Sequence, residues 1–233
     1  MKVVAVIPAL NCEKTIGGVV KGLNGLVDEI VVVDDGSTDN TKNNGRTNGA
    51  VVISHPENKG LGRALQTGFQ EALKREADII VTLDGDGQHN PSDVKKVLNM
   101  LIYNHCDVAI GSRLLDKNGW QNFPRHRLWG NLILTFLTNL ACGKKTTTDS
   151  QSGYRALKRK VIEKMELQSS RMAISSEIIF EVAKNNFNIK EVPIEATYED
   201  EVSNQRLFMD TLRIISMLFR KSFFAKIAKK IYG

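Results

Sequence analysis

The stretch Ile79-Ile80-Val81-Thr82-Leu83-Asp84-Gly85-Asp86-Gly87-Gln88 decides the fold, because a short apolar, β-branched run ends in two aspartates one residue apart. Such a run is typical of a strand that helices cover on both faces of a parallel sheet. Ligands of open α/β sheets bind beyond the carboxyl ends of the strands. Carboxylate oxygens at that place suit Mg²⁺ or Mn²⁺, which take further ligands from substrate phosphates and water. Asp84 and Asp86 therefore predict metal-assisted chemistry on a phosphorylated substrate.

Two other interpretations of the Asp-Gly-Asp triplet fit less well. An EF-hand loop needs glycine at its sixth position and a carboxylate at its twelfth, whereas here glycine is fourth (Gly87) and Lys95 is twelfth. Haloacid-dehalogenase phosphatases also carry an Asp-x-Asp pattern after a strand. They usually have it on the first strand, with Thr or Val where this chain has Gln88. The phosphatase is kept as a minor alternative.

Strand-like and helix-like segments alternate along the chain. Apolar runs predict strands at Val3–Ile7, Glu29–Val33, Ala50–Ser54, Asp78–Leu83, Asp107–Gly111 and near Lys190–Ala196. Helical spacing or capping residues predict helices at Glu13–Leu26, Leu61–Lys74, Pro91–Asn104, after Pro124 and at Ser175–Asn185. This alternation predicts the α/β class, a Rossmann-like, mostly parallel sheet flanked by helices.

Size and composition agree with one such domain. The chain has 233 residues, of which 42% are hydrophobic, enough for one well-formed core. Its three cysteines, Cys12, Cys106 and Cys142, lie far apart without Cys-x-x-Cys spacing, which argues against a disulfide framework and a zinc site. No apolar run is long enough to span a bilayer and no signal peptide is recognisable. We expect a cytoplasmic protein that meets a membrane only at its surface.

Positive charge gathers at the end of the chain. Gln205–Gly233 holds seven Lys or Arg residues and one Asp, so the whole formal charge of +6 lies there. Apolar residues recur at helical spacing in this tail and arginines recur every seven residues on another face: Phe208, Leu212, Ile215, Phe219 and Phe223, with Arg206, Arg213 and Arg220. Such a helix can lie in the headgroup region of an anionic leaflet; packing on the domain or binding a partner are the alternatives. We predict a domain at 1–204 and a membrane-surface tail at 205–233.

Nucleic acid is not an expected partner, because the catalytic part of the chain carries no net charge and no groove-reading motif. The sequence does not indicate an oligomeric state.

A second strand ends in carboxylates, in Ile30-Val31-Val32-Val33-Asp34-Asp35. Asp35 is a candidate to accept a hydrogen bond from a ribose hydroxyl or a base, whereas Ser37 and Asp39 fit capping and turn formation equally well. The turn at Lys59-Gly60 lacks the context of a dinucleotide fingerprint, which makes an oxidoreductase a poor fit. Its backbone N–H groups and the Lys59 ammonium can still approach a phosphate.

Six motifs occur in a characteristic order: Val6-Ile7-Pro8-Ala9-Leu10-Asn11, Val33-Asp34-Asp35-Gly36-Ser37-Thr38-Asp39, Asn58-Lys59-Gly60, Asp84-Gly85-Asp86-Gly87-Gln88-His89, Gly111-Ser112-Arg113 and Asp149-Ser150-Gln151-Ser152-Gly153-Tyr154-Arg155. Together they resemble family 2 glycosyltransferases of the GT-A fold, and more narrowly the dolichyl-phosphate mannose synthase-like branch. The resemblance covers about residues 1–215. Each motif is weak alone, but the ordered set is specific.

The resemblance implies a nucleotide-sugar donor and a metal. Base-pocket positions correspond to Pro8, Ala9, Leu10 and Asn11, and Asp35 corresponds to the residue that binds base or ribose. Asp84, Asp86 and Gln88 correspond to the residues that hold Mg²⁺ or Mn²⁺ against the donor pyrophosphate. Where the family usually reads Tyr-Asn-Glu, this chain has Leu10-Asn11-Cys12, so Glu13 is the candidate to replace the usual acidic residue.

The resemblance also implies a polyprenyl (dolichyl) phosphate acceptor at the cytosolic face of a membrane. Arg113 and Arg127 match basic positions that bind the lipid phosphate in similar synthases, a task that suits guanidinium geometry. One segment departs from the mannose synthases: Tyr198–Asn204 is acidic where they carry a basic turn. Mannose is therefore one candidate sugar among GDP-mannose, UDP-hexose and UDP-GlcNAc donors.

We therefore predict a metal-dependent, inverting glycosyltransferase. One rival is a family 2 enzyme with a saccharide or soluble hydroxyl acceptor, which needs a general base, with Asp149 or Glu177 as candidates. Another rival is a non-catalytic nucleotide-sugar-binding protein on membranes, which the complete metal motif disfavours.

Overall fold

The computed structural model describes residues 1–116, 123–197 and 212–221. Within them one sheet runs in the order β3-β2-β1-β4-β6-β5-β7. Its strands are β1 (Val3–Ala9), β2 (Glu29–Asp34), β3 (Val51–Ser54), β4 (Ile79–Thr82), β5 (Val108–Ser112), β6 (Arg155–Lys158) and β7 (Ile189–Pro193). Every strand pair is parallel except the two that β6 makes. The predicted α/β class is confirmed.

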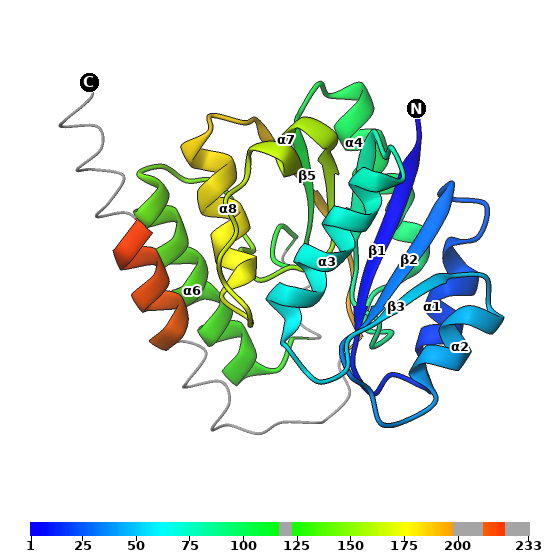
Figure 1. The fold of residues 1–233 in the computed structure, drawn as a ribbon. Coiled ribbons are helices and arrows are strands. Elements are labelled where there is room, and N and C mark those ends of the chain that lie inside the picture. The colour runs from blue at the N-terminus through cyan, green and yellow to red at the C-terminus, as the bar shows by residue number, and fades with distance from the viewer. Residues whose placement is uncertain (117–122, 198–211, 222–233) are drawn as a thin grey trace.

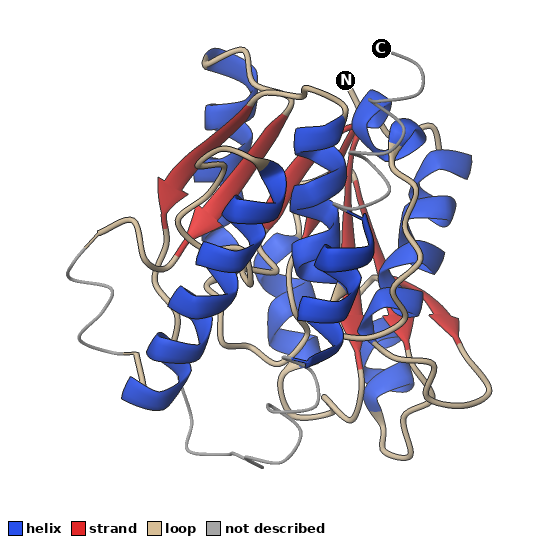
Figure 2. Cartoon of the chain, turned by 90° about the vertical axis from the view of Figure 1, so that its left-hand side faces the viewer, coloured by secondary structure: helices blue, strands red, loops and turns tan. Residues whose placement is uncertain are grey.

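Helices cover both faces of the sheet (Figures 1 and 2). On one face, α1 (Ile16–Leu23) and α4 (Val94–Tyr103, preceded by the 3-10 turn Pro91–Asp93) bury their apolar stripes, and α3 (Leu61–Lys74) and α8 (Ile174–Lys184) do so on the other. The remaining helices are α2 (Thr41–Thr47), α6 (Arg125–Cys142) and α7 (Arg159–Lys164). Because β1, β2 and β4 are covered on both sides, they are apolar at almost every position, as the sequence indicated.

Strand β6 was not predicted, and it shapes the site. It lies between β4 and β5 and runs antiparallel to both, with Thr82 opposite Arg155 and Ala109 opposite Ala156. An antiparallel strand begins at the edge where its neighbours end. The loop that precedes β6 therefore comes to the carboxyl ends of β4 and β5. Four residues that end in Lys158 carry too weak a local pattern to reveal this position.

Residues 212–221 form a helix that lies beside α6 and α8 (red, green and yellow in Figure 1). Ile214, Met217 and Leu218 are buried against a cluster that includes Leu134 and Phe180. The alternative in which the tail packs on the domain is thus confirmed for these residues. Three side chains of the predicted apolar face point to solvent nonetheless: Leu212, Ile215 and Phe219. The other predicted members, Arg206, Phe208 and Phe223, lie outside the described residues.

None of the helices in the described ranges is both long and apolar enough to cross a membrane.

Candidate active site

Asp84 follows β4 and is the carboxylate of the predicted site that lies against Gly153. It is half-buried, and no donor from residues 1–116, 123–197 or 212–221 hydrogen-bonds to it. Gly153 lies directly against it: a Cβ at Gly153 would fall 2.6 Å from Oδ2 and 2.9 Å from Oδ1 of Asp84. Thr82 Oγ1 donates to the carbonyl of Gly153 at 2.6 Å and holds this glycine in place. The missing side chain therefore leaves room for the Asp84 carboxylate.

Asp86 completes the acidic pair. Its Oδ1 accepts a hydrogen bond from the backbone N–H of Gln88 at 2.9 Å. Burial raises the pKa of Asp86, and the negative charge of Asp84 raises it further. Burial also raises the pKa of Asp84, although Arg113 and Arg155 oppose this rise. Neighbouring carboxylates with raised pKa values are stabilised as anions by a cation bound between them.

The donor set fits a divalent cation bound with its substrate. Hard carboxylate oxygens are available from Asp84 and Asp86, and the Gln88 side chain lies two residues further on the same turn. Across the described ranges no cluster of three or more His, Cys, Asp or Glu side chains is arranged for a metal. The expected site matches Mg²⁺ or Mn²⁺, since such ions bind through one or two protein carboxylates and take other ligands from phosphates and water.

Arg113 is fixed beside this pair by Asp149. The guanidinium donates from Nε and Nη2 to the carboxylate at 2.7 and 2.9 Å, and it lies over the Phe123 ring with 5.3 Å between Cζ and the ring centroid. Asn131 of α6 also donates to Asp149, at 3.0 Å. Burial would raise the pKa of Asp149, but Arg113 and these hydrogen bonds hold it below its usual value. Asp149 is thus an ion-pair partner, which corrects its candidacy as a general base.

Arg127 lies in the first turn of α6, four residues before Asn131 and therefore on the same side of the helix. Arg155 is almost completely buried, and its Nη2 donates to the carbonyls of Ser150 and Ser175 at 3.0 and 3.1 Å. Burial lowers the pKa of Arg155 to about 10, against the charges of Asp149 and Asp84. Arg155 therefore acts from within the protein, as a buried positive charge that interacts with Asp149 and Asp84.

The ends of β1 and β2 are joined by hydrogen bonds. Asn11, with φ of 53°, donates its N–H to Ser37 Oγ at 2.9 Å, and its Oδ1 accepts from the N–H of Thr38 at 3.0 Å. Glu13 Oε2 accepts from the N–H of Asn40 at 3.1 Å. Asp39 accepts two hydrogen bonds from Thr41, which agrees with the turn role proposed for it. These contacts hold the predicted base-pocket segment Pro8–Asn11 against the loop after β2.

Within that segment, Pro8 and Ala9 are buried in β1, whereas Leu10 exposes about 40% of its surface. Asn11 is exposed as well, so Leu10 and Asn11 are the members of the segment that can offer side chains to a ligand.

Asp35 is held by the Lys59-Gly60 turn and by His55. Its Oδ1 accepts from the N–H of Lys59 at 3.0 Å and pairs with His55 Nδ1 at 2.7 Å, and its Oδ2 accepts from the N–H of Gly60 at 2.7 Å. Further along, Ser170 O accepts from the N–H of Gly62 at 2.9 Å. The prediction that backbone N–H groups of this turn bind a phosphate is wrong, because protein oxygens occupy them.

Close packing explains the glycines of the turn, since a Cβ at Gly60 would fall 2.5 Å from Ser170 O. Ligand roles for the Asp35 carboxylate and the Lys59 ammonium stay predictions.

Glu177, the second candidate base, lies in α8 and is completely buried. It accepts from the N–H groups of Gln168 and Ser169 at 3.1 and 2.8 Å and pairs with Lys221 Nζ at 2.9 Å. Lys221 also contacts Glu181, so one cation of the C-terminal helix serves two buried carboxylates. Glu177 is therefore a structural residue, and its candidacy as a base is corrected.

Two contributors to the site were missed at the level of the sequence. Asn131 orients Asp149 from α6, and Gly153 gives Asp84 its clearance. Gly153 belongs to the quoted motif that ends in Arg155, so a motif signal existed. Its physical role becomes visible only when β6 places it beside β4.

Known proteins resemble this chain in sequence and in fold. The model of the family described as "Glycosyl transferase family 2" matches residues 4–166. A UDP-N-acetylglucosamine–dolichyl-phosphate N-acetylglucosaminyltransferase of Methanococcus voltae is 38% identical over 215 residues, which cover 84% of this chain and 85% of the relative. A dolichol-phosphate mannosyltransferase of Pyrococcus furiosus is 32% identical over 234 residues, covering 94% of this chain and 64% of the relative.

Among solved structures, glucosyl-3-phosphoglycerate synthase from Mycobacterium tuberculosis, crystallised with Mn²⁺, UDP and glucosyl-3-phosphoglycerate, superposes with a TM-score of 0.77. It is 20% identical and covers 95% of this chain and 80% of its own. At that identity the likeness concerns the fold.

Proposed function

Because the chain belongs to glycosyl transferase family 2 and is a glycosyltransferase of the GT-A fold, we propose that it transfers a sugar from a nucleotide diphosphate sugar to polyprenyl (dolichyl) phosphate. The observation that carries the proposal is the Asp84 carboxylate, open toward Gly153 and adjacent to Asp86 at the end of β4. The dolichyl-phosphate substrates in the names of both relatives support the choice of acceptor.

In this proposal Asp84 and Asp86, with the Gln88 amide, hold Mg²⁺ or Mn²⁺. A divalent cation at this place supplies charge neutralisation for the departing nucleoside diphosphate. Arg113 and Arg155 contribute positive charges that oppose the rise in the pKa of Asp84 caused by burial. The crystallised relative that contains Mn²⁺ supports a divalent ion of this class.

The acceptor is a phosphate rather than a hydroxyl group. Sugar transfer to a hydroxyl needs a base to remove its proton, whereas a phosphate monoester is already an anion at neutral pH. Both carboxylates that were candidates for that base, Asp149 and Glu177, are held in buried ion pairs. Arg113, held rigid by Asp149, and Arg127 at the start of α6 are proposed to position the acceptor phosphate.

The donor lies over the ends of β1 and β2. We assign the base and ribose to the segment Pro8–Asn11 and to Asp35, with Glu13 stabilising the loop between them and the Lys59 ammonium near the phosphates. The relatives' names include N-acetylglucosamine and mannose, and both donor classes, UDP and GDP sugars, enter the test below. A lipid acceptor also implies work at the cytosolic membrane surface, with the basic tail as one contact.

The test is a transfer assay with the full chain. The protein is incubated with Mg²⁺ or Mn²⁺, a panel of UDP and GDP sugars, and either undecaprenyl phosphate or a set of saccharide acceptors. We expect a chloroform-soluble sugar phospholipid, lost on chelation. Transfer confined to saccharides would refute the acceptor, and release of inorganic phosphate without transfer would favour a phosphatase.

A further inference from the structure

Helix α6 carries large apolar side chains on its outer surface. Trp129, Ile133, Phe136 and Leu140 are 53–66% exposed. Four exposed side chains of this size on one helix form a patch of the kind that marks an interaction site. The C-terminal helix beside α6 adds Phe219, which is 75% exposed.

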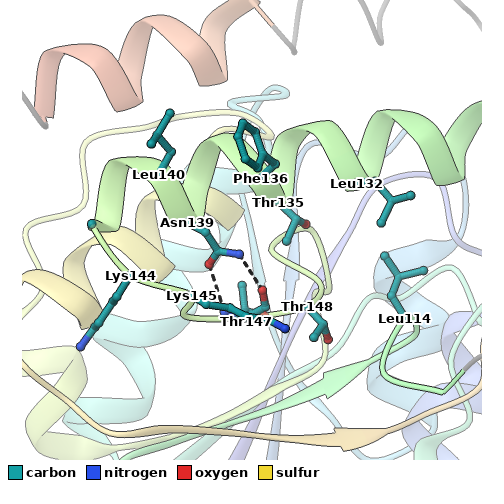
Figure 3. Close-up of a pocket in the computed structure, with 11 residues that line it drawn as sticks. Leu114, Leu132, Thr135, Phe136, Asn139, Leu140, Lys144, Lys145, Thr147 and Thr148 are labelled. Atoms are coloured by element: carbon teal, nitrogen blue, oxygen red, sulfur yellow. Dashed lines mark hydrogen bonds between the residues drawn. The ribbon is translucent and has the colours of Figure 1, made fainter.

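A groove runs along the same helix (Figure 3). Its volume is about 660 Å³, within the range of small-molecule sites. Its apolar lining comes from Leu114, Leu132, Phe136 and Leu140, and Lys144 and Lys145 line its end beyond α6.

One end of the groove lies at the proposed acceptor site. Leu114 directly follows Arg113, and Thr148, which also lines the groove, directly precedes Asp149. The hydroxyls of Ser112 and Thr148 share a hydrogen bond of 2.7 Å, which joins the end of β5 to the groove wall. The other end lies past Gly143, where the left-handed turn that ends α6 leads to the two lysines. The groove therefore leads from the Arg113–Asp149 pair to a basic surface.

The wall opposite α6 is built to stay in place. Asn139 donates to the carbonyl of Thr147 at 2.9 Å and accepts from the N–H of the same residue at 3.2 Å, as the dashed lines of Figure 3 mark. Its Oδ1 also accepts from the N–H of Thr146 at 2.8 Å. Thr147 and Thr148 also donate to Glu191 Oε1. Because these polar groups bond to each other, the groove offers mainly apolar surface to an occupant, and it is formed before any occupant arrives.

We propose that this groove binds the isoprenoid chain of the acceptor next to its phosphate. The inference rests on the proposed function. The phosphate lies at Arg113, the first isoprene units lie between α6 and the wall from Thr147 to Thr148, and the chain leaves at Lys144 and Lys145 into the leaflet.

Charge supports this direction. Residues 123–148 contain four Lys or Arg and no Asp or Glu, so the lysine end suits anionic headgroups. A saccharide would find few hydrogen-bonding groups on the apolar lining. The exposed face of α6 would then lie at the membrane surface, and the active site would open toward the leaflet.

The test compares acceptors of two lengths. Dimethylallyl phosphate has one isoprene unit and is too short to reach Leu140, whereas undecaprenyl phosphate extends beyond it. For L140Q we expect KM for undecaprenyl phosphate to rise about tenfold through lost apolar contact, with kcat unchanged and KM for dimethylallyl phosphate unchanged. The matched control is I133Q, on the same helix and similarly exposed but outside the groove lining. It reports any weakening of membrane contact by itself, so it should raise KM for undecaprenyl phosphate less than L140Q does and leave KM for dimethylallyl phosphate unchanged.

The possible outcomes distinguish a failure of the groove proposal from a failure of the proposed function. Equal KM values for both acceptors in the wild type, or equal effects of L140Q and I133Q, would overturn the groove while leaving transfer to polyprenyl phosphate intact. Absence of transfer to either phosphate would overturn the proposed function itself. Because Leu140 is largely exposed, L140Q is expected to fold, which circular dichroism and the unfolding temperature would check.

Discussion

Arg113 and Asp149 form a two-pronged ion pair across the proposed acceptor site, with Nε to Oδ2 at 2.7 Å and Nη2 to Oδ1 at 2.9 Å. The pair joins the end of β5 to the loop that precedes β6. Asp149 is completely buried and Arg113 is mostly so. This geometry gives the guanidinium one orientation, and it removes the carboxylate from the proton-transfer role that its position in the sequence allowed.

We first predict that Asp149→Asn destabilises the fold. The change leaves the Arg113 charge without its buried partner, and loss of one member of such a pair costs about 3–5 kcal/mol. The loss of unfolding free energy can be measured by urea denaturation. Glu163→Gln, which breaks the exposed pair with Arg159, is the control and should cost about 1 kcal/mol or less. A stable Asp149→Asn variant with normal donor binding and no transfer would instead identify Asp149 as a base.

The same pair predicts a pH dependence of stability. The pKa of Asp149 lies below its ordinary value of 3.8 in the folded protein, so its contribution is complete above that value and is lost as pH falls through the lower, folded pKa. The difference in unfolding free energy between wild type and Asp149→Asn should therefore be constant from neutral pH down to about pH 5 and shrink in more acidic solution. A difference that grows on acidification would contradict this assignment.

A third prediction concerns the acidic pair. Asp84→Asn and Asp86→Asn should each lower kcat/KM by about 100-fold or more, since the charge-neutralising group at the leaving diphosphate is weakened. Calorimetry with UDP or GDP should also lose its dependence on Mn²⁺. Asp78→Asn serves as the control and should keep activity. Asp78 directly precedes the first residue of β4, far along the strand from Asp84, and its side chain is half exposed. Full turnover in both site variants would refute the metal assignment.

Gly153→Ala should disable the site without removing any functional group. The new Cβ would overlap Asp84 Oδ2, so either the carboxylate or the loop must move. A displacement of about 1 Å is enough to lower transfer about 100-fold. Gly18→Ala is the control, because nothing lies within 4 Å of its Cβ position and alanine in a helix stabilises by about 0.5–1 kcal/mol. Activity of Gly153→Ala close to wild type would show that Asp84 does not need this clearance.

Lys221 and Glu177 should behave as a structural pair. Lys221→Met leaves the buried Glu177 without its cation and Glu181 with Lys184 at 3.6 Å, and we expect a loss of about 3–5 kcal/mol, measured by denaturant unfolding. Glu177→Gln should lower the unfolding temperature but keep kcat, because its oxygens bind backbone N–H groups and Lys221 rather than an acceptor. The variant that combines Lys221→Met with Glu177→Gln should lose less unfolding free energy than the sum of the losses in the two single variants. A specific loss of kcat in a stable Glu177→Gln protein would restore the general-base alternative.

Local pattern alone was sufficient for much of the fold. Strands such as β1 and β4 are apolar throughout because helices cover both faces of the sheet. Helices such as α3 show one apolar stripe. In both cases the positions of the apolar residues in the sequence indicate which side chains are buried. Short elements with mixed composition were missed: β6, α2 and α7. Their residues acquire structure from neighbours that are distant in the chain, as Ala156 does between Val81 and Ala109.

The sequence by itself determined that two carboxylates end a buried strand, because strand period and apolar composition are local properties. It also indicated the family through its ordered motifs. Which carboxylates are open to ligands was decided only by the tertiary structure. Asp84 stays open because Gly153 faces it, whereas Asp149 and Glu177 are held by N–H groups and cations brought from distant segments. A hydrogen-bond partner that lies far away in the chain leaves no trace in the local pattern, so only the folded arrangement separates a binding carboxylate from a structural one.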